Sequence, residues 1–477
     1  MNSRALTSES PLAMEPPINH FDDPGPRYSG YPRAAEFHGR IAETEFRNWA
    51  RLSNEELIPK PLSLNFHIPF CSSICYHCAN NKIIPGERQK TEHYLRNLQF
   101  EIEIQSQLYD RDREVVQLRW AGGAPGYLTH RQAQDLMVKI RQNFNLSRAG
   151  PAEFSIEIDP RVIAKDAMAE LRSLGFNRIS IGVYDLDAQV QQAVGRVQNP
   201  EATAAVIKDA NNYGIRSTNI DLIYGLPRQT VQSFAVTLDR IVGLDPDQIT
   251  IYNYAQLPHR FPRQRRFQAG DLPDAAEKLA ILHYATERLC SAGYAHIGMD
   301  HFAKPDHELA QAQRDGRLHR NFQSYSTQGQ CDSIGFGVAA ISQVHDNFSQ
   351  NTNSLEVYHD SLDLRKLPIV KGYVSLEDDL LRREIIHDLS SQFHLDKRKY
   401  DNKWNIDFDQ LFTSELSRLA DMEEQGLLEL GEDEINLREP GRLLVRNICM
   451  VFDSFQQPAS VARLFAKRFK SAQAHLT

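Results

Sequence analysis

The segment His67-Ile68-Pro69-Phe70-Cys71-Ser72-Ser73-Ile74-Cys75-Tyr76-His77-Cys78 begins in the last two residues of a run of β-forming residues, 62–68. Its cysteines have the spacing C-x3-C-x2-C, and they are three of only six in the chain. Three thiolates on one loop can bind three irons of a [4Fe–4S] cubane and leave the fourth iron open. We therefore predict that Cys71, Cys75 and Cys78 hold such a cluster at the end of the first strand.

The open iron indicates the chemistry of the site. The amino and carboxylate groups of S-adenosylmethionine can chelate a free iron, whereas a purely structural metal site closes its coordination shell with protein ligands. Two other interpretations remain at this point. The cysteines could bind zinc with His77 or His67 as a fourth ligand, or they could be inert.

Around this loop, short apolar runs alternate with longer helical stretches. The expected strands are residues 62–68, 115–120, 154–159, 178–183, 218–224 and 248–253. The expected connecting helices include residues 91–109, 129–145 and 187–210. Buried β-branched runs separated by helices are typical of parallel strands. We predict an α/β fold with an incomplete (β/α)6 barrel, whose active site lies at the carboxyl ends of its strands.

Beyond about residue 270 the pattern becomes mostly helical. Long helices are expected at 275–292, 377–393 and 408–425, followed by a hairpin at 427–437 that resembles a small winged-helix unit. We divide the chain into a disordered N-terminus (1–20), an extended segment with a helix (21–60), the partial barrel (61–270) and a mostly helical C-terminal domain (271–477). The Pro- and Gly-rich stretch at 22–33 is either a linker or a rigid segment that lines an anion site.

Composition narrows the functional class. The chain has 477 residues, 41% hydrophobic and 24% charged, with a formal net charge of −8. This charge argues against a broad nucleic-acid interface, which requires a clustered basic surface. No apolar run is long enough to span a membrane, and the N-terminus lacks a basic-then-apolar signal. We expect a cytoplasmic protein without a membrane or nucleic-acid partner, and nothing in the sequence requires more than a monomer.

The motif and its surroundings resemble one family closely. C-x3-C-x2-C is the radical-SAM signature, and the chain resembles oxygen-independent coproporphyrinogen III oxidases over roughly residues 20–455. The matching stretches are PGPRYSGYP (24–32), PLSLNFHIPFC (61–71), SIEIDP (155–160), STNIDLIYGLP (217–227), NYAQLP (253–258), GMDHFAKPDHELA (298–310), LHRNFQSYSTQG (318–329) and GRLLVRNICMVFD (441–453).

The resemblance implies an activity and its cofactors. A [4Fe–4S] cluster would cleave S-adenosylmethionine to a 5′-deoxyadenosyl radical, which starts the oxidative decarboxylation of two propionates of coproporphyrinogen III to give protoporphyrinogen IX. The resemblance also implies a second bound S-adenosylmethionine, a tetrapyrrole substrate, an electron donor and an electron acceptor.

Family positions can be carried over one by one. The S-adenosylmethionine contacts fall on Asn65, His77, Gly122, Gly123, Ala124, Glu157, Tyr184, Arg196, Asp221, Ala255, Gln323 and Ile341. Of these, Gln323 and Ile341 match the region of the second molecule. The guanidinium of Arg196 can pair with the methionine carboxylate.

The substrate carries four propionates, so its binding site needs cations. Four arginines within the matched stretches are candidates on this charge argument: Arg27, Arg33, Arg320 and Arg446.

Six positions depart from the family pattern, and they gather at the cofactor site. Asn80 stands where the oxidases have a fourth cysteine, and Asn65 replaces a tyrosine. His77 replaces an aromatic residue, Ala124 a threonine, Tyr184 a glutamine and Gln256 a histidine. Two hypotheses follow. The chain is a working oxidase, or it is an altered paralogue that binds and delivers a tetrapyrrole or acts on a different one.

Overall fold

The computed structural model describes residues 26–456 except 40, 74, 85–87, 149, 151 and 165. The expected disorder at 1–20 therefore lies outside the described residues. None of the helices in the described part is both long and apolar enough to cross a bilayer.

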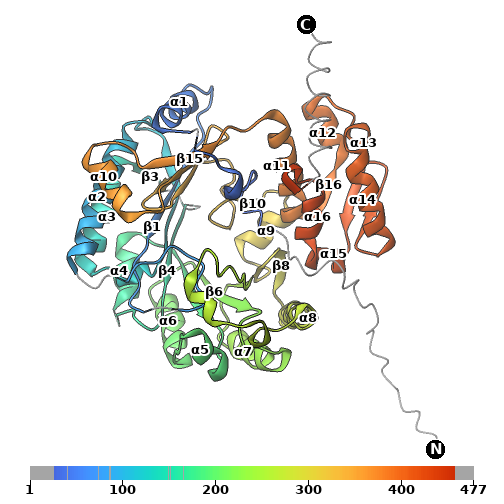
Figure 1. Ribbon diagram of the computed structural model, residues 1–477, viewed down its shortest axis with the longest axis horizontal. Helices are drawn as coiled ribbons and strands as arrows, with labels where there is room; N and C mark the ends of the chain where they lie inside the picture. Colours follow the sequence, from blue (N-terminus) through green and yellow to red (C-terminus); the bar gives the residue numbers. More distant parts are fainter. Residues whose placement is uncertain are drawn as a thin grey trace, which may run out of the picture.

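A large mixed sheet forms the centre of the molecule (Figure 1). Its middle contains six parallel strands that neighbour one another in chain order. They are β1 (Leu62–Ile68), β2 (Glu114–Gly122), β4 (Glu153–Ile158), β5 (Arg178–Tyr184), β6 (Ser217–Tyr224) and β7 (Gln248–Asn253). Aliphatic side chains of these strands are buried against the surrounding helices, as expected for a parallel sheet covered on its outer face. The predicted partial barrel is confirmed.

The crossover helices are α2 (Arg88–Ser106), α3 (His130–Asn143), α4 (Ala167–Leu174), α5 (Ala188–Val194), α6 (Pro200–Asn212) and α7 (Val231–Gly243). The single helix expected over 187–210 is wrong, because the segment forms α5 and α6. Gly195 has a left-handed φ of 66° and ends α5, and Asn199 then caps a new helix with Pro200 in its first turn.

Strands from the C-terminal half extend both edges of the sheet. On one side β12 (Asp332–Phe336) runs parallel to β1 and is followed by antiparallel β13 (Ile341–Val344), β14 (Asn347–Asn351) and β15 (Ile369–Tyr373). On the other side lie antiparallel β9 (His301–Ala303) and β8 (Ala295–Gly298), and β3 (Asn145–Leu146) pairs with β2. The barrel unit thus continues past the boundary expected at 270, because residues 295–373 complete its sheet.

The C-terminal unit has a hydrophobic core of its own, and we place its start near residue 376. It contains α11 (Glu377–Gln392), α12 (Lys397–Trp404), α13 (Phe408–Leu411), α14 (Thr413–Glu424), α15 (Glu439–Leu443) and α16 (Val445–Val451). The helix expected over 408–425 is divided at Phe412, where the backbone leaves helical geometry (φ −104°, ψ 24°). The expected hairpin is β17 (Leu428–Leu430) and β18 (Glu434–Leu437), and β16 (His394–Asp396) pairs with β18.

The remaining elements are α1 (Glu43–Asn54), α8 (Ala275–Ser291), α9 (Glu308–Arg314), α10 (Leu355–Asp363), β10 (His319–Arg320), β11 (Tyr325–Ser326) and short 3₁₀ turns at Ala34–Glu36, Pro125–Tyr127, Pro262–Arg266, Ala269–Asp271 and Ser454–Gln456.

The N-terminal segment 26–33 lies between the barrel and the C-terminal unit (Figure 1). Tyr28 and Tyr31 are buried in the core of the C-terminal unit, and the Tyr28 hydroxyl donates to Asp453 Oδ2 at 3.0 Å. The segment is therefore anchored by buried aromatic side chains, which excludes the linker interpretation. It brings Arg27 to the carboxyl ends of the strands.

Candidate active site

The three-cysteine loop leaves β1 at Ile68 and is held by backbone hydrogen bonds. The Cys71 amide donates to the Ile83 carbonyl at 3.0 Å, and the Ile83 amide donates to Pro69 at 2.8 Å. The Tyr76 amide donates to the Val194 carbonyl at the end of α5, at 2.8 Å. These bonds fix both ends of the loop at the mouth of the barrel.

The thiols suit a cluster better than a single ion. Cys71 and Cys75 are buried and Cys78 is half-buried, and the Asn80 amide donates to Cys78 Sγ at 3.4 Å. Among the residues that the structure describes, no three His, Cys, Asp or Glu side chains converge on a point that one metal ion could occupy. A cubane does not require such convergence, because each thiolate binds a different iron.

Neither histidine completes a zinc site. His67 Nε2 lies 3.2 Å from the Asn81 carbonyl oxygen, and the His77 ring packs against Tyr184. Burial lowers the pKa of both imidazoles. Among the described residues neither ring joins a group of three ligands that could hold one ion. The donor set therefore fits the predicted cluster, with three thiols and the Asn80 backbone N–H turned toward the Cys78 sulfur.

Two arginines flank Cys75 and share one carboxylate. Arg196 Nη1 lies 3.6 Å and Arg161 Nη2 lies 3.8 Å from Cys75 Sγ. Asp159 Oδ2 accepts from both, at 3.0 Å and 2.6 Å respectively. Burial opposes ionisation of Asp159, but these guanidinium groups lower its pKa to about 2. These two guanidinium groups place positive charge beside one sulfur of the predicted cluster site.

Arg196 is also held from two further sides. Its Nη2 donates to the Gly182 carbonyl at 2.5 Å, and its guanidinium carbon lies 4.4 Å from the centre of the Tyr184 ring. Tyr184 has a left-handed φ of 73°, which turns this residue at the end of β5 toward the site.

The glycine motif joins the second strand to the cysteine loop. The Gly123 amide donates to the Ile68 carbonyl and the Ala124 amide to the Phe70 carbonyl, both at 2.8 Å. A Cβ on Gly123 would lie 2.4 Å from the Phe70 carbonyl oxygen, so only glycine allows this close approach. Gly122 donates to Glu157 Oε2 at 3.1 Å, and its carbonyl accepts from Asn80 Nδ2 at 3.2 Å.

The pKa values of two carboxylates at the next strand ends shift in opposite directions. Glu157 Oε1 accepts from Arg119 Nη2 at 2.6 Å, and this contact lowers the Glu157 pKa although burial opposes the shift. Asp221 accepts from Ser180 Oγ at 2.7 Å and Asn219 Nδ2 at 2.8 Å. Burial nevertheless raises the pKa of Asp221 to about 6.

These side chains line two adjoining hollows at the strand ends. The larger, with a volume of about 440 Å³, we call the site cavity. Of the predicted residues it is lined by His77, Cys78, Glu157, Tyr184, Asp221, Ala255, Gln323, Arg27 and Arg320. The smaller hollow is lined by Cys71, Cys75, Gly123, Ala124 and Arg196, and it shares Glu157, Tyr184 and Asp221 with the site cavity.

Arg27 and Arg320 enter the site cavity from distant parts of the chain. The Arg27 guanidinium lies 4.6 Å from the centre of the Tyr252 ring, and that of Arg320 lies 4.6 Å from the centre of the Tyr325 ring. Arg320 Nη2 donates to the Arg27 carbonyl at 3.2 Å, whereas its Nε and Nη1 have no hydrogen-bond partner among the described residues.

Five predicted residues do not line either hollow. Asn65 lies in β1 opposite Arg119, and Gly122 contacts the site only through its backbone. Ile341 is in β13, paired with Gln350. Arg33 binds Glu36 at 2.7 Å and lies 3.6 Å from Asp453. Arg446 forms a buried ion pair with Asp300 at a neighbouring cavity.

Sequence reasoning missed Lys82, Arg119, Asp159, Arg161 and Tyr252, which also line these hollows. Asp159 and Arg161 lie just after the end of β4. Their position at the carboxyl end of a parallel strand could have identified them as site residues. Lys82 lies four positions after Cys78. Burial opposes its charge, but Tyr184 and the cysteines raise the pKa of Lys82.

Comparison with known proteins gives one consistent answer. Residues 65–241 match the model of the Radical SAM superfamily. The chain is 45% identical to the oxygen-independent coproporphyrinogen III oxidase of Pseudomonas aeruginosa over 92% of its length and 95% of the relative. It is 42% identical to that of Escherichia coli, over 94% and 97% respectively. The solved structure of the Escherichia coli coproporphyrinogen III oxidase, described as a radical SAM enzyme, superposes with a TM-score of 0.85 at 43% identity and covers 90% of this chain and 97% of its own.

Proposed function

The chain belongs to the family of oxygen-independent coproporphyrinogen III oxidases, which are radical SAM enzymes, and from this premise we propose that it converts coproporphyrinogen III to protoporphyrinogen IX in heme biosynthesis. The observation that carries the proposal is the likeness over nearly the whole chain. It includes the C-terminal unit and the N-terminal segment as well as the barrel, and it coincides with three thiols at the mouth of that barrel.

Cys71, Cys75 and Cys78 would hold the [4Fe–4S] cluster. When bound, the cluster supplies the electron for reductive cleavage of S-adenosylmethionine, the reaction that begins hydrogen abstraction in this superfamily. The guanidinium groups of Arg161 and Arg196 stabilise negative charge at Cys75, since both lie within 4 Å of its sulfur.

The chain's remaining groups position the cofactor and the substrate. Asp221 and Glu157 are acceptors for hydroxyl and ammonium groups, and both face the smaller hollow beside the cysteines. Arg27 and Arg320 would bind propionates, because Arg320 has buried N–H donors without a protein partner. An electron donor and an electron acceptor must come from other molecules.

The deciding experiment is anaerobic reconstitution with iron and sulfide, followed by reduction. We expect 5′-deoxyadenosine and CO2 that depend on added coproporphyrinogen III, with protoporphyrinogen IX as product. If the protein binds heme stoichiometrically but yields no deoxyadenosine, the tetrapyrrole-carrier hypothesis replaces this one.

A further inference from the structure

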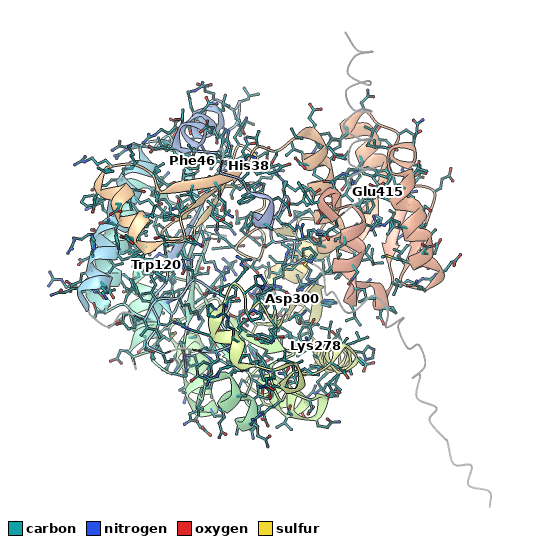
Figure 2. All side chains as sticks on the ribbon, viewed as in Figure 1. His38, Phe46, Trp120, Lys278, Asp300 and Glu415 are labelled. Atoms are coloured by element: carbon teal, nitrogen blue, oxygen red, sulfur yellow. The ribbon has the colours of Figure 1, made fainter. Side chains whose placement is uncertain are left out.

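A second cavity of about 570 Å³ lies beside the site cavity, and we call it the α8 cavity. It is bounded by α8, by the end of β7 and by Leu443–Asn447 of the C-terminal unit. Figure 2 labels Lys278 and Asp300, two of its polar residues, on the side of the barrel nearest the C-terminal unit. Its volume is in the range of small-molecule sites.

The lining of the α8 cavity is apolar with a few polar groups. The apolar part consists of Leu257, Leu272, Leu279, Leu282, Met299, Leu443 and Leu444. Two cationic side chains face it, Arg446 and Lys278. Arg446 is already neutralised by its buried ion pair with Asp300. Lys278 is therefore the cation available to a ligand.

Lys278 has no ion pair or side-chain hydrogen bond with the residues that the structure describes. Its alkyl chain packs over Gly225, where a Cβ would lie 3.2 Å from Lys278 Cε. Burial lowers its pKa, and no neighbouring charge opposes that shift. Lys278 is half-buried, and neither carboxylate that also lines the cavity, Asp274 or Asp300, forms an ion pair with it in the described chain. Its ammonium group is therefore available to a ligand carboxylate.

The α8 cavity adjoins the site cavity along one wall. Asn253, Tyr254 and Ala255 line both. Asn253 Oδ1 and the Tyr254 hydroxyl are buried in this wall without a hydrogen-bond partner in the described chain, so its polar groups are incompletely satisfied. A ligand larger than either cavity could extend across this boundary.

We propose that the α8 cavity receives one propionate-bearing edge of the tetrapyrrole and that the Lys278 ammonium binds its carboxylate. This rests on the proposed function, because it assumes a tetrapyrrole with propionates on several sides of its ring. Arg27 and Arg320 can reach only the propionates on the side of the site cavity. A carboxylate on an apolar ring edge matches a largely apolar cavity in which Lys278 is the cation without an ion pair in the described chain.

The test measures the affinity of the protein for two porphyrins by fluorescence titration, with the same cosolvent in both titrations. Coproporphyrin III is the stable oxidised form of the substrate and carries four carboxylates, whereas its tetramethyl ester carries none. We expect Lys278→Met to weaken coproporphyrin III binding about tenfold, the effect of losing one ion pair of about 1.4 kcal/mol. Ester binding should be unchanged, and Lys278→Arg should retain most of the affinity.

Arg288→Met is the matched control, since Arg288 lies on the same helix but pairs at the surface with Asp239. It should bind both porphyrins like the wild type. Equal losses for acid and ester in Lys278→Met would indicate a structural role and overturn the proposal, as would no loss at all. A wild type that binds neither porphyrin would also overturn it. A failure of the proposed function is distinguishable from these outcomes. In that case the wild type would bind coproporphyrin III but form no 5′-deoxyadenosine in the reconstitution experiment.

Discussion

The imidazole of His77 packs edge-on against the phenol ring of Tyr184, with ring centroids 5.0 Å apart and planes at 76°. Arg196 stacks on the same tyrosine, 4.4 Å from its centre. His77 comes from the cysteine loop and Tyr184 from the end of β5, and each was expected from the resemblance to depart from the family pattern. Two changes that look independent in the sequence are thus one packed contact beside the cluster loop.

This contact predicts that the two substitutions are coupled. In a double-mutant cycle of His77→Phe and Tyr184→Gln, the free energies of S-adenosylmethionine binding should be non-additive by about 0.5–1.5 kcal/mol, because Tyr184→Gln removes the ring against which residue 77 packs and so changes the effect of His77→Phe. Equilibrium dialysis with the reconstituted protein measures this. A cycle of His77→Phe with Tyr213→Phe, an exposed site, should be additive. Additivity in the first cycle would contradict the coupling.

The cluster prediction concerns metal content. Cys75→Ser should abolish the iron–sulfur absorbance, because only two thiolates of the loop would remain. Asn80→Cys should leave the iron content unchanged, since the fourth iron is reserved for S-adenosylmethionine. Cys331→Ser is the control and should behave as the wild type. If Asn80→Cys instead restores a cluster that the wild type lacks, the three-cysteine site is wrong.

The arginine pair predicts a shift in redox potential. Arg161 Nη2 lies 3.8 Å from Cys75 Sγ, so Arg161→Met removes positive charge beside the cluster. Reduction adds negative charge, and the midpoint potential should therefore fall. An EPR-monitored titration measures it, with the exposed Arg172→Met as control. An unchanged or higher potential in Arg161→Met, at equal iron content, would contradict this electrostatic role.

Asp221 predicts a pH-dependent cost in stability. Burial raises its pKa from 3.8 to about 6, so the folded apoprotein binds this proton more tightly than the unfolded chain does. The protonated Asp221 side chain therefore stabilises the folded state. This stabilisation is lost as the pH rises through about 6, and it is regained as the pH falls toward 4. Asp221→Asn should stabilise the apoprotein at pH 7 by roughly 1–3 kcal/mol, with a smaller gain at pH 5. Denaturant titrations at both pH values test this, and a gain that does not depend on pH would contradict the linkage.

A buried ion pair in the C-terminal unit predicts a large loss of folding stability when one partner is replaced. Arg382 Nη1 contacts Glu415 Oε1 at 3.0 Å, and both side chains are almost fully buried (Figure 2 labels Glu415). Arg382→Met should destabilise the protein by about 3–5 kcal/mol, because it removes one partner of a buried ion pair. Arg398→Met, at an exposed pair, should cost less than about 1 kcal/mol. Similar losses in the two variants would contradict the prediction.

The sequence alone determined the barrel and the cluster loop. Residues 62–68 and 248–253 were predicted with the bounds that β1 and β7 have, since apolar β-branched runs between helices are a local signal. Parallel strands all end at one edge, so the residues after β1, β2, β4, β5 and β6 were expected to meet there. The local signal was weakest where one helix ends and the next begins. Gly195 and Pro200 divide one expected helix into two.

Only the tertiary structure decided which distant side chains share the site. Arg27 reaches Tyr252, and Arg320 contacts the Arg27 backbone, because the aromatic anchors Tyr28 and Tyr31 are buried in the C-terminal unit. The hydrogen bond from Asn80 to Gly122 and the approach of Arg161 to Cys75 also depend on how the strands align. Local propensity carries no information on such contacts, since they arise from burial and packing between segments far apart in the chain. The sequence thus predicts where along the chain the cluster binds, and the packing of the units determines what surrounds the three cysteines.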